Sequence, residues 1–573
     1  MSATPRVMIA APSSGNGKTA VAVGLLAALR SRGLVTAGFK VGPDFLDAGY
    51  LGVAAGRPGR NLDPGLVGTA LLPALFGHGA AGAEVSVIEA TMGLYDGLSG
   101  HTDVPSSAQV AELLKAPVAL VVDVAAMGQS VAAMVHGFRV YDELLWLGGV
   151  ILNQVASDRH EQVLREALDD IGVPVLGALR RRELSGVALP SRADGLVPVV
   201  HRSTDVARAI RRLAEVITGS VDLDRLLMLA RSAPDLGTEA WSPAAAVGPW
   251  SPPAGAGPWS PPAAAGPVSI GVGPWPSASA PAPSSARQHS TGTGAWPISA
   301  GPSSPARPPL QAGSPLQAGP SSPAGPPAMA VGRWPSPVAA GPSPIAGGPL
   351  VGGSLAGGTG AFGTAPVPGS FRPMIGVTTG YGYPETAELL AAAGAEVVGV
   401  DPLRDETLPD GVRGLVIGGG LPEGYLDELS ANGSLNLAVA RLAAAGYPIV
   451  AEGAGLAWLC REYDGRPMCG VIDAAGRTGE HVVIGYRDAT VRSVSPVLPL
   501  GTRIVGYKQH RGLVSPRAGE QPAWSWPGGA PEGFVSVGLH ASYLCLHWAA
   551  APEMAVRFVT AAAGGAPTMR LAS

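Results

Sequence analysis

Near its start the chain reads Ala11-Pro12-Ser13-Ser14-Gly15-Asn16-Gly17-Lys18-Thr19. The apolar residues 7–10 come directly before this loop, and an Ala- and Leu-rich segment, residues 18–30, opens at its end. A buried strand, a glycine-rich turn and a helix in this order are the context of a phosphate-binding P-loop. The sequence therefore predicts an α/β domain with a parallel sheet and a nucleotide site after its first strand.

The loop offers five candidates for nucleotide binding, which are Gly15, Asn16, Gly17, Lys18 and Thr19. Its glycines let backbone N–H groups curl around phosphates, and the start of the following helix adds a positive dipole end. Lys18 can reach the terminal phosphates, and the Thr19 hydroxyl can hold Mg²⁺. Pro12 stands where the usual pattern has its first glycine.

The composition excludes several classes of protein. The 573 residues include 39 Lys+Arg and 43 Asp+Glu, and the net charge of -4 gives no electrostatic reason to bind nucleic acid. No apolar run approaches the ~20 residues that span a bilayer. Three cysteines, an odd number without metal-ligand spacing, suit a reducing compartment. We therefore expect a cytoplasmic protein that binds neither nucleic acid nor membrane.

A long segment of low complexity divides the chain. Gly and Pro make up about 24% of all residues, about twice their ordinary share. Residues 241–370 contain no Asp, Glu or Lys, only three Arg and six of the eleven Trp. This composition predicts a disordered Pro/Gly/Ala/Ser linker over residues 231–371, without secondary structure and with solvated tryptophans. A tryptophan-dependent docking surface is the alternative interpretation.

Two α/β domains flank this linker, over residues 1–230 and 372–564. In the first, buried parallel strands are predicted at residues 7–10, 85–88, 118–122 and 149–152. In the second, the same pattern predicts strands at residues 375–378, 396–400, 414–417 and 448–451. Residues 386–393 and 435–445 are the helices expected between them.

Further motifs accompany the P-loop, and each contains two carboxylates. These motifs are Lys40-Val41-Gly42-Pro43-Asp44-Phe45-Leu46-Asp47 and Glu89-Ala90-Thr91-Met92-Gly93-Leu94-Tyr95-Asp96-Gly97. With them the chain resembles the cobyrinic acid a,c-diamide synthases, ATP-dependent amidotransferases of corrin-ring biosynthesis. The wider family includes cobyric acid and dethiobiotin synthetases. The resemblance covers most of both domains.

The resemblance implies a two-step reaction on a corrinoid substrate. ATP phosphorylates a peripheral carboxylate of the ring, and ammonia then displaces the phosphate to leave an amide. The family's motifs place the nucleotide on the P-loop and assign Mg²⁺ to Thr19, Asp44 and Glu89, with Asp47 and Asp96 as second choices. Two positions depart from the family pattern, since Leu51 and Ala193 stand where a His is common.

The second domain resembles class I glutamine amidotransferases but lacks their catalytic pair. The turn Ile417-Gly418-Gly419-Gly420-Leu421 resembles the one that supplies oxyanion-hole amides. Gly453 stands where the family has its nucleophilic Cys, and Cys545 stands where it has its catalytic His. Thioester chemistry needs both a thiolate and an imidazole. No catalytic residue is therefore assigned in this domain.

Other cysteines and histidines give little prospect of replacing the missing pair. Cys460 lies seven residues beyond Gly453, which on the helix expected there would place it about 10 Å farther along the axis. Cys545 could meet His547 or His510 in an inverted arrangement, but a buried, unreactive thiol is the favoured interpretation.

Three functional hypotheses remain from the sequence. The first is a corrinoid a,c-diamide synthase that uses free ammonia or ammonia from another glutaminase, with a homodimer as a candidate assembly. The second is a non-catalytic paralogue that binds nucleotide and corrinoid and acts as a regulator or partner. The third is a ligase that amidates a different acid by the same chemistry, because a fold does not determine its substrate.

Overall fold

The computed structural model describes residues 4–97, 105–192, 195–196, 198–200, 203–248, 371–419, 423–536 and 538–564. All of these described residues belong to one compact unit. Most of the predicted linker, residues 249–370, and Ala193 lie outside them.

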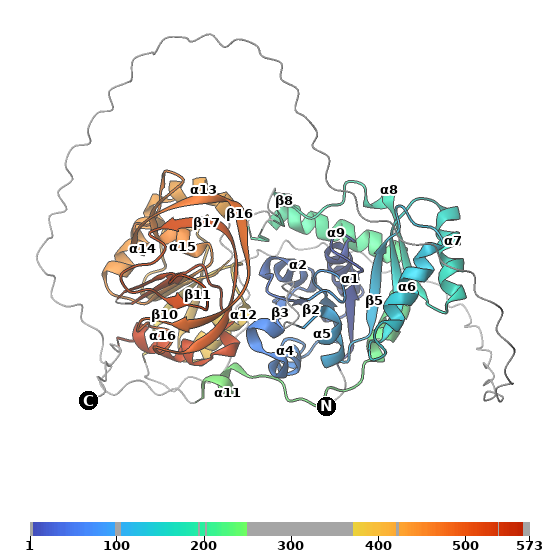
Figure 1. Cartoon of the computed structure of the whole chain (residues 1–573), viewed down its shortest axis with the longest axis horizontal. Helices are drawn as coiled ribbons and strands as arrows, with labels where there is room; N and C mark the ends of the chain where they lie inside the picture. Colours follow the sequence, from blue (N-terminus) through green and yellow to red (C-terminus); the bar gives the residue numbers. More distant parts are fainter. Residues whose placement is uncertain are drawn as a thin grey trace, which may run out of the picture. The chain divides into compact units, whose positions relative to one another are not determined.

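The first half of the chain forms a parallel sheet (Figure 1). Its strands are β1 (Arg6–Ala10), β2 (Thr36–Val41), β3 (Arg60–Leu62), β4 (Val85–Glu89), β5 (Val118–Asp123), β6 (Leu147–Val155) and β7 (Val175–Arg180). They are arranged in the order β3-β2-β4-β1-β5-β6-β7, and every neighbouring pair is parallel. Because β1 lies between β4 and β5, the loop after β1 opens beside the carboxyl ends of both neighbours.

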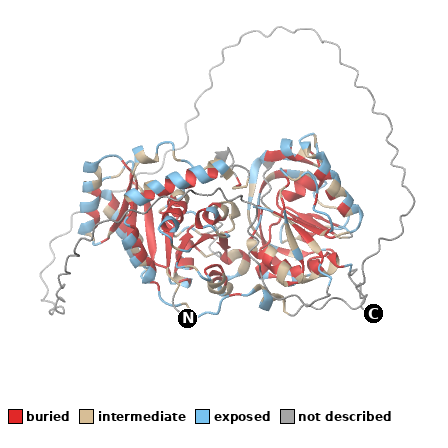
Figure 2. Cartoon of the chain, turned by 180° about the vertical axis from the view of Figure 1, so that it is seen from behind, coloured by how far each residue is buried: buried red, intermediate tan, exposed pale blue. Residues whose placement is uncertain are grey.

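Helices cover both faces of this sheet. Residues of β1 alternate between the faces: Val7 and Ile9 pack into one core, Met8 and Ala10 into the other. The first core is covered by α1 (Lys18–Ser31), α2 (Phe45–Ala55), α9 (Ser203–Ser220) and α10 (Leu223–Arg231). The second is covered by α4 (Leu72–Gly79), α5 (Ser107–Leu113), α6 (Ser130–Val140) and α7 (Asp158–Asp170). Figure 2 shows the buried strands in red between helices with pale blue outer faces.

Short elements complete the first half. They are α3 (Pro64–Val67), η1 (Thr69–Leu71), α8 (Arg181–Leu184), the strand pair β8 (Ser191–Arg192) and β9 (Gly195–Leu196), and α11 (Pro243–Val247).

The beginning of the predicted linker is ordered. Residues 243–247 form α11, with Ser242 as its N-cap, so the prediction of no secondary structure is wrong there. Trp241 is buried rather than solvated, since its ring meets His78 edge-on with centroids 5.1 Å apart. Its backbone N–H also donates to the Ala74 carbonyl at 2.9 Å. The packing of Trp241 on α4 orders this part of the chain although its composition is of low complexity.

The second half contains a six-stranded sheet. Its strands are β10 (Met374–Thr378), β11 (Glu396–Val400), β12 (Val412–Ile417), β13 (Ile449–Glu452), β19 (Phe534–Ser536) and β20 (Leu539–Ser542). The order is β11-β10-β12-β13-β20-β19, and only the edge strand β19 is antiparallel to its neighbour among these described strands. This arrangement brings the ends of β12, β13 and β20 together.

A second sheet and several helices surround the first. The sheet contains β14 (Cys460–Tyr463), β15 (Arg466–Pro467), β16 (Ile472–Val491), β17 (Arg503–Ser515) and β18 (Trp524–Ser525). Its largest part is the antiparallel pairing of β16 with β17. The helices are α12 (Pro384–Ala392), η2 (Glu423–Tyr425), α13 (Leu426–Ala431), α14 (Gly433–Ala444), α15 (Gly455–Leu459), η3 (Trp548–Ala550) and α16 (Glu553–Ala562).

The predicted strands and helices of both halves are confirmed to within a few residues. Each predicted apolar run forms a strand, although in β11 only Val400 is buried. The helices at residues 18–30, 386–393 and 435–445 correspond to α1, α12 and α14. Within the described ranges, every helix is too short or too polar to cross a membrane.

Candidate functional site

The P-loop joins β1 to α1 as the sequence predicts. Gly17 is the N-cap of α1 with φ +92, and a Cβ at this position would lie 2.6 Å from Nδ2 of Asn153. Only glycine satisfies both the left-handed backbone and this close approach. Gly15 lies exposed at the tip of the loop, with no heavy atom near its missing Cβ. The loop therefore keeps an open face where a phosphate would approach the start of a helix.

Asn16 fixes the loop to the neighbouring strands. Its Oδ1 accepts a hydrogen bond of 2.9 Å from the Asp123 backbone N–H, and its Nδ2 donates to the Ser13 carbonyl at 3.0 Å. The Asn153 side chain donates to the Asn16 carbonyl at 2.8 Å. Asn16 and Asn153 thus hold the phosphate loop against the ends of β5 and β6.

Lys18 is buried and bound to backbone carbonyls. Its Nζ donates to Met92 O at 2.6 Å and to Ser13 O at 3.0 Å. Burial, with Lys40 as a second cause, lowers the pKa of Lys18. Met92 has the left-handed φ of +51, which is uncommon outside glycine. An ammonium held by carbonyls alone is able to exchange them for phosphate oxygens.

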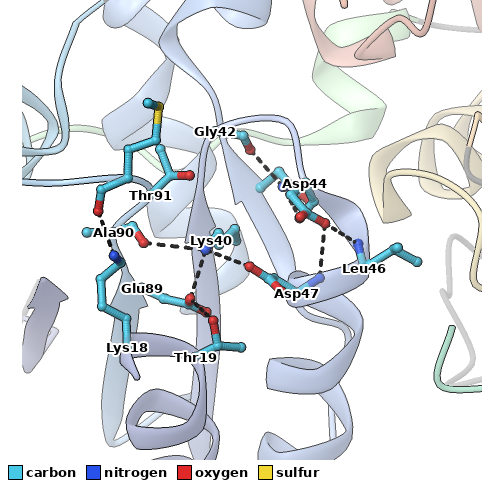
Figure 3. Close-up of polar contacts among 12 residues, drawn as sticks. Lys18, Thr19, Lys40, Gly42, Asp44, Leu46, Asp47, Glu89, Ala90 and Thr91 are labelled. Atoms are coloured by element: carbon cyan, nitrogen blue, oxygen red, sulfur yellow. Dashed lines mark hydrogen bonds and ion pairs between the residues drawn. The ribbon is translucent and has the colours of Figure 1, made fainter. Parts of the chain in front are cut away.

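Two side chains donate hydrogen bonds to Glu89 at the end of β4. The Thr19 hydroxyl donates to Glu89 Oε1 at 2.5 Å, and Lys40 Nζ donates to the same oxygen at 2.8 Å. Lys40 also pairs with Asp47 Oδ2 at 2.7 Å. Figure 3 shows the Lys40 nitrogen between the carboxylates of Glu89 and Asp47. The site is thus a buried cation flanked by two carboxylates beside the P-loop threonine.

Burial sets the electrostatics of this cluster. It raises the pKa of the Glu89 carboxyl, whereas Lys40 acts in the opposite direction. The pKa of Lys40 is itself raised, because Glu89 and Asp47 together outweigh the burial of its ammonium. Lys40 therefore remains a cation, and it keeps the two acidic groups within a few ångströms of each other.

Asp44 and Asp96 have positions different from that of Glu89. Asp44 caps α2, where its Oδ1 accepts from the Leu46 N–H at 2.9 Å and the Asp47 N–H at 3.2 Å. Burial and the nearby Asp47 raise the pKa of Asp44. Asp96 closes a turn by accepting the Gly93 N–H at 2.8 Å. Thr19 and Glu89 are in direct contact, whereas Asp44 reaches them only through the Lys40 and Asp47 pair.

The residues present fit a bound Mg²⁺. Glu89 Oε2 is buried and has no hydrogen-bond partner, and the Thr19 hydroxyl lies at the other oxygen of the same carboxylate. Within the described residues no three His, Cys, Asp or Glu side chains form a ligand shell by themselves. Mg²⁺ is commonly held by one or two carboxylates together with phosphates and waters, so Thr19 and Glu89 would suffice as its protein ligands.

In the second half, the loop after β12 fills the place next to Gly453. Gly453 follows β13 with φ +53, and a Cβ there would lie 2.2 Å from the Gly419 carbonyl oxygen. The Ala454 N–H, at the start of the following helix, points to that same oxygen at 3.4 Å. A protein carbonyl thus occupies the space that a nucleophile and an oxyanion would need.

Cys545 lies beside the same loop. A Cβ on Gly419 would fall 2.3 Å from the Cys545 Sγ, so Gly419 separates Gly453 from this thiol. Burial, with Glu452 as a second cause, raises the pKa of Cys545 above its ordinary value. A thiol that resists ionisation is a poor nucleophile, which agrees with the interpretation of Cys545 as a buried, unreactive residue.

The nearby histidines do not activate this thiol. His510 Nδ1 lies 2.9 Å from the Gly512 carbonyl, its ring stacks on Tyr543, and burial lowers its pKa to about 3. The ring nitrogens of His547 have no hydrogen-bond partner, so neither histidine bonds to Cys545. The inverted Cys/His arrangement is therefore not formed among these described side chains.

Cys460 is also unreactive, for a reason that differs from the sequence prediction. It does not lie on the helix after Gly453, because α15 ends at Leu459 and Cys460 begins β14. Burial raises the pKa of its thiol to about 12, and its Sγ lies 3.4 Å from the Leu456 carbonyl. The helix is shorter than expected, but the conclusion about Cys460 is the same.

Comparison with known proteins identifies both halves. Residues 7–189 match the CobQ/CobB/MinD/ParA nucleotide binding domain, and residues 381–553 match the CobB/CobQ-like glutamine amidotransferase domain. The chain is 45% identical to "Hydrogenobyrinate a,c-diamide synthase" of Streptomyces coelicolor, over 97% of both chains. The chain belongs to the hydrogenobyrinate and cobyrinate a,c-diamide synthase family.

Other members of the a,c-diamide synthase family match over similar lengths. "Hydrogenobyrinate a,c-diamide synthase" of Mycobacterium bovis is 39% identical over 98% of both chains. "Cobyrinate a,c-diamide synthase" of Gloeobacter violaceus is 32% identical over 96% of both chains. The chain is therefore an enzyme of this amidotransferase family, and its first domain is a nucleotide-binding domain that implies ATP as the nucleotide.

The sequence motifs alone assign no role to Lys40. The sequence nevertheless contains an indication of a role, because Lys40 is the one charged residue in strand β2. A lysine in a strand that is buried along its whole length needs carboxylate partners. In this family member those partners are Glu89 and Asp47, two of the residues that the motifs had singled out.

Proposed function

We propose that the chain amidates the a and c side-chain carboxylates of hydrogenobyrinic or cobyrinic acid in cobalamin biosynthesis, with ATP as the energy source. Residues 1–230 would form the synthetase domain, and residues 372–564 a glutamine amidotransferase-like domain without a working glutaminase. The names of the relatives that match the chain over nearly its full length support this assignment.

The reaction consists of two displacements. A carboxylate oxygen of the corrinoid attacks the γ-phosphorus of ATP, and ADP leaves. The acyl phosphate is then attacked by NH₃, so that a C–N bond forms, the C–O bond to phosphate breaks, and hydrogen phosphate departs with one proton of the ammonia. Activation is needed because a free carboxylate is a poor acyl donor, since it has no good leaving group for NH₃ to displace.

Residues of the P-loop serve the first step. Lys18 would exchange Met92 O for terminal phosphate oxygens, while N–H groups of the loop and of α1 stabilise the charge that develops on them. Thr19 and Glu89 would hold Mg²⁺, which supplies charge neutralisation and orients the phosphates. Lys40 keeps Glu89 and Asp47 in place beside this site.

The nitrogen source is ammonia rather than glutamine. The observation that carries this part of the proposal is Gly453, whose missing side chain is replaced by the Gly419 carbonyl oxygen at 2.2 Å from the Cβ position. Without a thiol at this position no thioester can form, and Cys545 provides no imidazole in its place. Ammonia would come from solution or from another glutaminase in the cytoplasm. A homodimer remains part of the proposal.

The test is turnover of hydrogenobyrinic and cobyrinic acids with MgATP, run in parallel with glutamine and with ammonium chloride, and read as added amides by mass spectrometry. We expect product with ammonium and none with glutamine. The Lys18→Ala variant should lose product with both nitrogen sources. Equal rates with glutamine and ammonium would contradict the ammonia dependence, and no product from either source would contradict the enzymatic assignment to these acids.

A further inference from the structure

A buried histidine and a buried glutamate face each other beside the inactive glutaminase centre. His547 precedes η3, and Glu385 lies in the first turn of α12. Both are 1% exposed, and His547 Nε2 lies 3.7 Å from Glu385 Oε2. The imidazole stacks on Tyr383 with ring centroids 4.5 Å apart, which fixes its plane.

Polar atoms of this pair have no partner. Glu385 Oε1 accepts a hydrogen bond of 2.7 Å from Arg60, but Glu385 Oε2 and both ring nitrogens of His547 accept or donate none. Nearly all buried polar atoms in proteins are hydrogen-bonded, because an unpaired one keeps the full cost of its desolvation. Three such atoms within one pair of side chains point to a small polar ligand.

The charges at this place select the chemistry of the ligand. Burial lowers the pKa of His547, so its ring is neutral and one ring nitrogen is an acceptor. The charged groups that act on it are Glu385, which raises its pKa, and Arg60, which lowers it. Two acceptors 3.7 Å apart can share one donor nitrogen at the ordinary ~2.9 Å from each. Ammonium, with four N–H donors and one positive charge, matches an imidazole nitrogen and a carboxylate.

We infer that His547 and Glu385 bind ammonium and convert it to ammonia for the synthetase. This inference rests on the proposed function, in which free ammonia is the nitrogen source. Glu385 holds the cation, and His547 Nε2 accepts a hydrogen bond from one of its N–H groups. Because the lowered pKa of His547 makes the ring a weaker base than NH₃, the proton moves to Nε2 only transiently, as NH₃ leaves the pair for the acyl phosphate, and the imidazolium so formed is paired with Glu385. The imidazolium returns the proton to water, and NH₃ attacks the acyl phosphate with loss of hydrogen phosphate.

The pair is connected to the nucleotide-binding domain by direct contacts. The Tyr383 hydroxyl, on the residue that stacks on His547, donates to the Pro43 carbonyl at 3.0 Å. Asn61, which follows the Arg60 that binds Glu385, donates to the carbonyls of Gly42 at 2.7 Å and Asp44 at 3.0 Å. Ammonia released at His547 is therefore produced beside the turn that carries Asp44.

The wild-type enzyme tests the inference through the pH dependence of its KM for ammonium. An enzyme that uses only preformed NH₃ shows a KM for total ammonium that falls about tenfold per pH unit below the pKa of ammonium. We expect this KM to change less than about threefold per pH unit from pH 6.5 to 8.5, because the site takes up the abundant ammonium ion. A tenfold fall per pH unit in the wild-type enzyme would overturn the inference.

Two variants add a second measurement. In His547→Gln and Glu385→Gln, we expect the KM for total ammonium at pH 7 to rise at least tenfold, with KM for ATP unchanged. The rise should shrink as pH increases, since NH₃ is then supplied by solution. The matched control is His540→Gln, because His540 is also buried, and burial alone, without a charged partner among the described residues, lowers its pKa.

The outcomes separate this inference from the proposed function. Product formation with an unchanged KM for ammonium in a folded His547→Gln variant would overturn the inference alone. No product from wild-type enzyme with ammonium at any pH would overturn the proposed function and the role of the pair together. Thermal unfolding of each variant shows whether it is folded, and the wild-type pH profile decides the question if the variants are not.

Discussion

Lys40 is the residue on which the charge balance of the nucleotide site depends. Its side chain is 4% exposed, and its ammonium pairs with Asp47 and Glu89 at 2.7 and 2.8 Å. In Lys40→Met both carboxylates lose their cation inside the protein, and removal of one partner of a buried pair destabilises by about 3–5 kcal/mol. We expect Lys40→Met to lower the free energy of unfolding in urea by this amount and to abolish ATP-dependent amidation. Lys115→Met, at an exposed position, should change stability by less than about 0.5 kcal/mol.

Glu452 makes stability depend on pH. Burial raises the pKa of its carboxyl from 4.5 to about 7, although Trp548 Nε1 and the Leu546 N–H donate to it. The folded protein thus retains a proton that the unfolded chain releases near pH 4.5. Protonated Glu452 therefore contributes to the free energy of unfolding in full below about pH 4.5, and this contribution is lost as the pH rises through about 7. The loss is on the order of 3 kcal/mol. The measurement is the free energy of urea unfolding at about pH 5 and at about pH 8. It should fall less between these two pH values for Glu452→Gln than for wild type. An equal fall in both proteins would contradict this assignment.

At the level of elements, the strands and helices that can be predicted from the sequence are those whose apolar residues follow a regular pattern. Continuous apolar runs identify β1, β4 and β5, and the loop motif places a nucleotide site after β1. The contact between Thr19 and Glu89 follows, because β4 pairs with β1 and their carboxyl ends meet. The long strands β16 and β17 are not predicted, since exposed residues interrupt their apolar pattern. The roles of Lys40 and of the Gly419 carbonyl also could not be predicted, because both depend on neighbours that are distant in the sequence.

The segment after α10 supplies a prediction at this scale. Trp241 packs on His78 of α4, in a stretch whose composition indicates a linker. We expect Trp241→Ala to lower the free energy of unfolding by about 3 kcal/mol, the smaller end of the range for a buried aromatic residue. Trp146→Ala is the matched control, since Trp146 is 46% exposed, and it should have a clearly smaller effect. Equal effects of the two substitutions would show that Trp241 is not packed in solution.

At the scale of the whole molecule, a buried ion cluster connects residues that are more than 300 positions apart in the sequence. Arg60 pairs with Glu385 at 2.7 Å and with Glu388, which also binds His78 at 2.9 Å. Tyr486 adds a second connection by donating to both oxygens of Asp63, at 3.0 and 2.9 Å. The two halves therefore stabilise each other through polar contacts that exclude water.

Loss of Arg60 should uncouple the unfolding of the two halves. Arg60→Met leaves Glu385 and Glu388 buried without their guanidinium, which destabilises by about 3–5 kcal/mol. We expect a lower midpoint in calorimetry and a single thermal transition that separates into two. The matched control is Arg32→Met, which removes an exposed pair with Asp224 and should cost less than about 1 kcal/mol. If Arg60→Met behaved like Arg32→Met, the buried cluster could not be what couples the halves, and the contacts of Tyr486 with Asp63 and of Tyr383 with Pro43 would be the next connections to test.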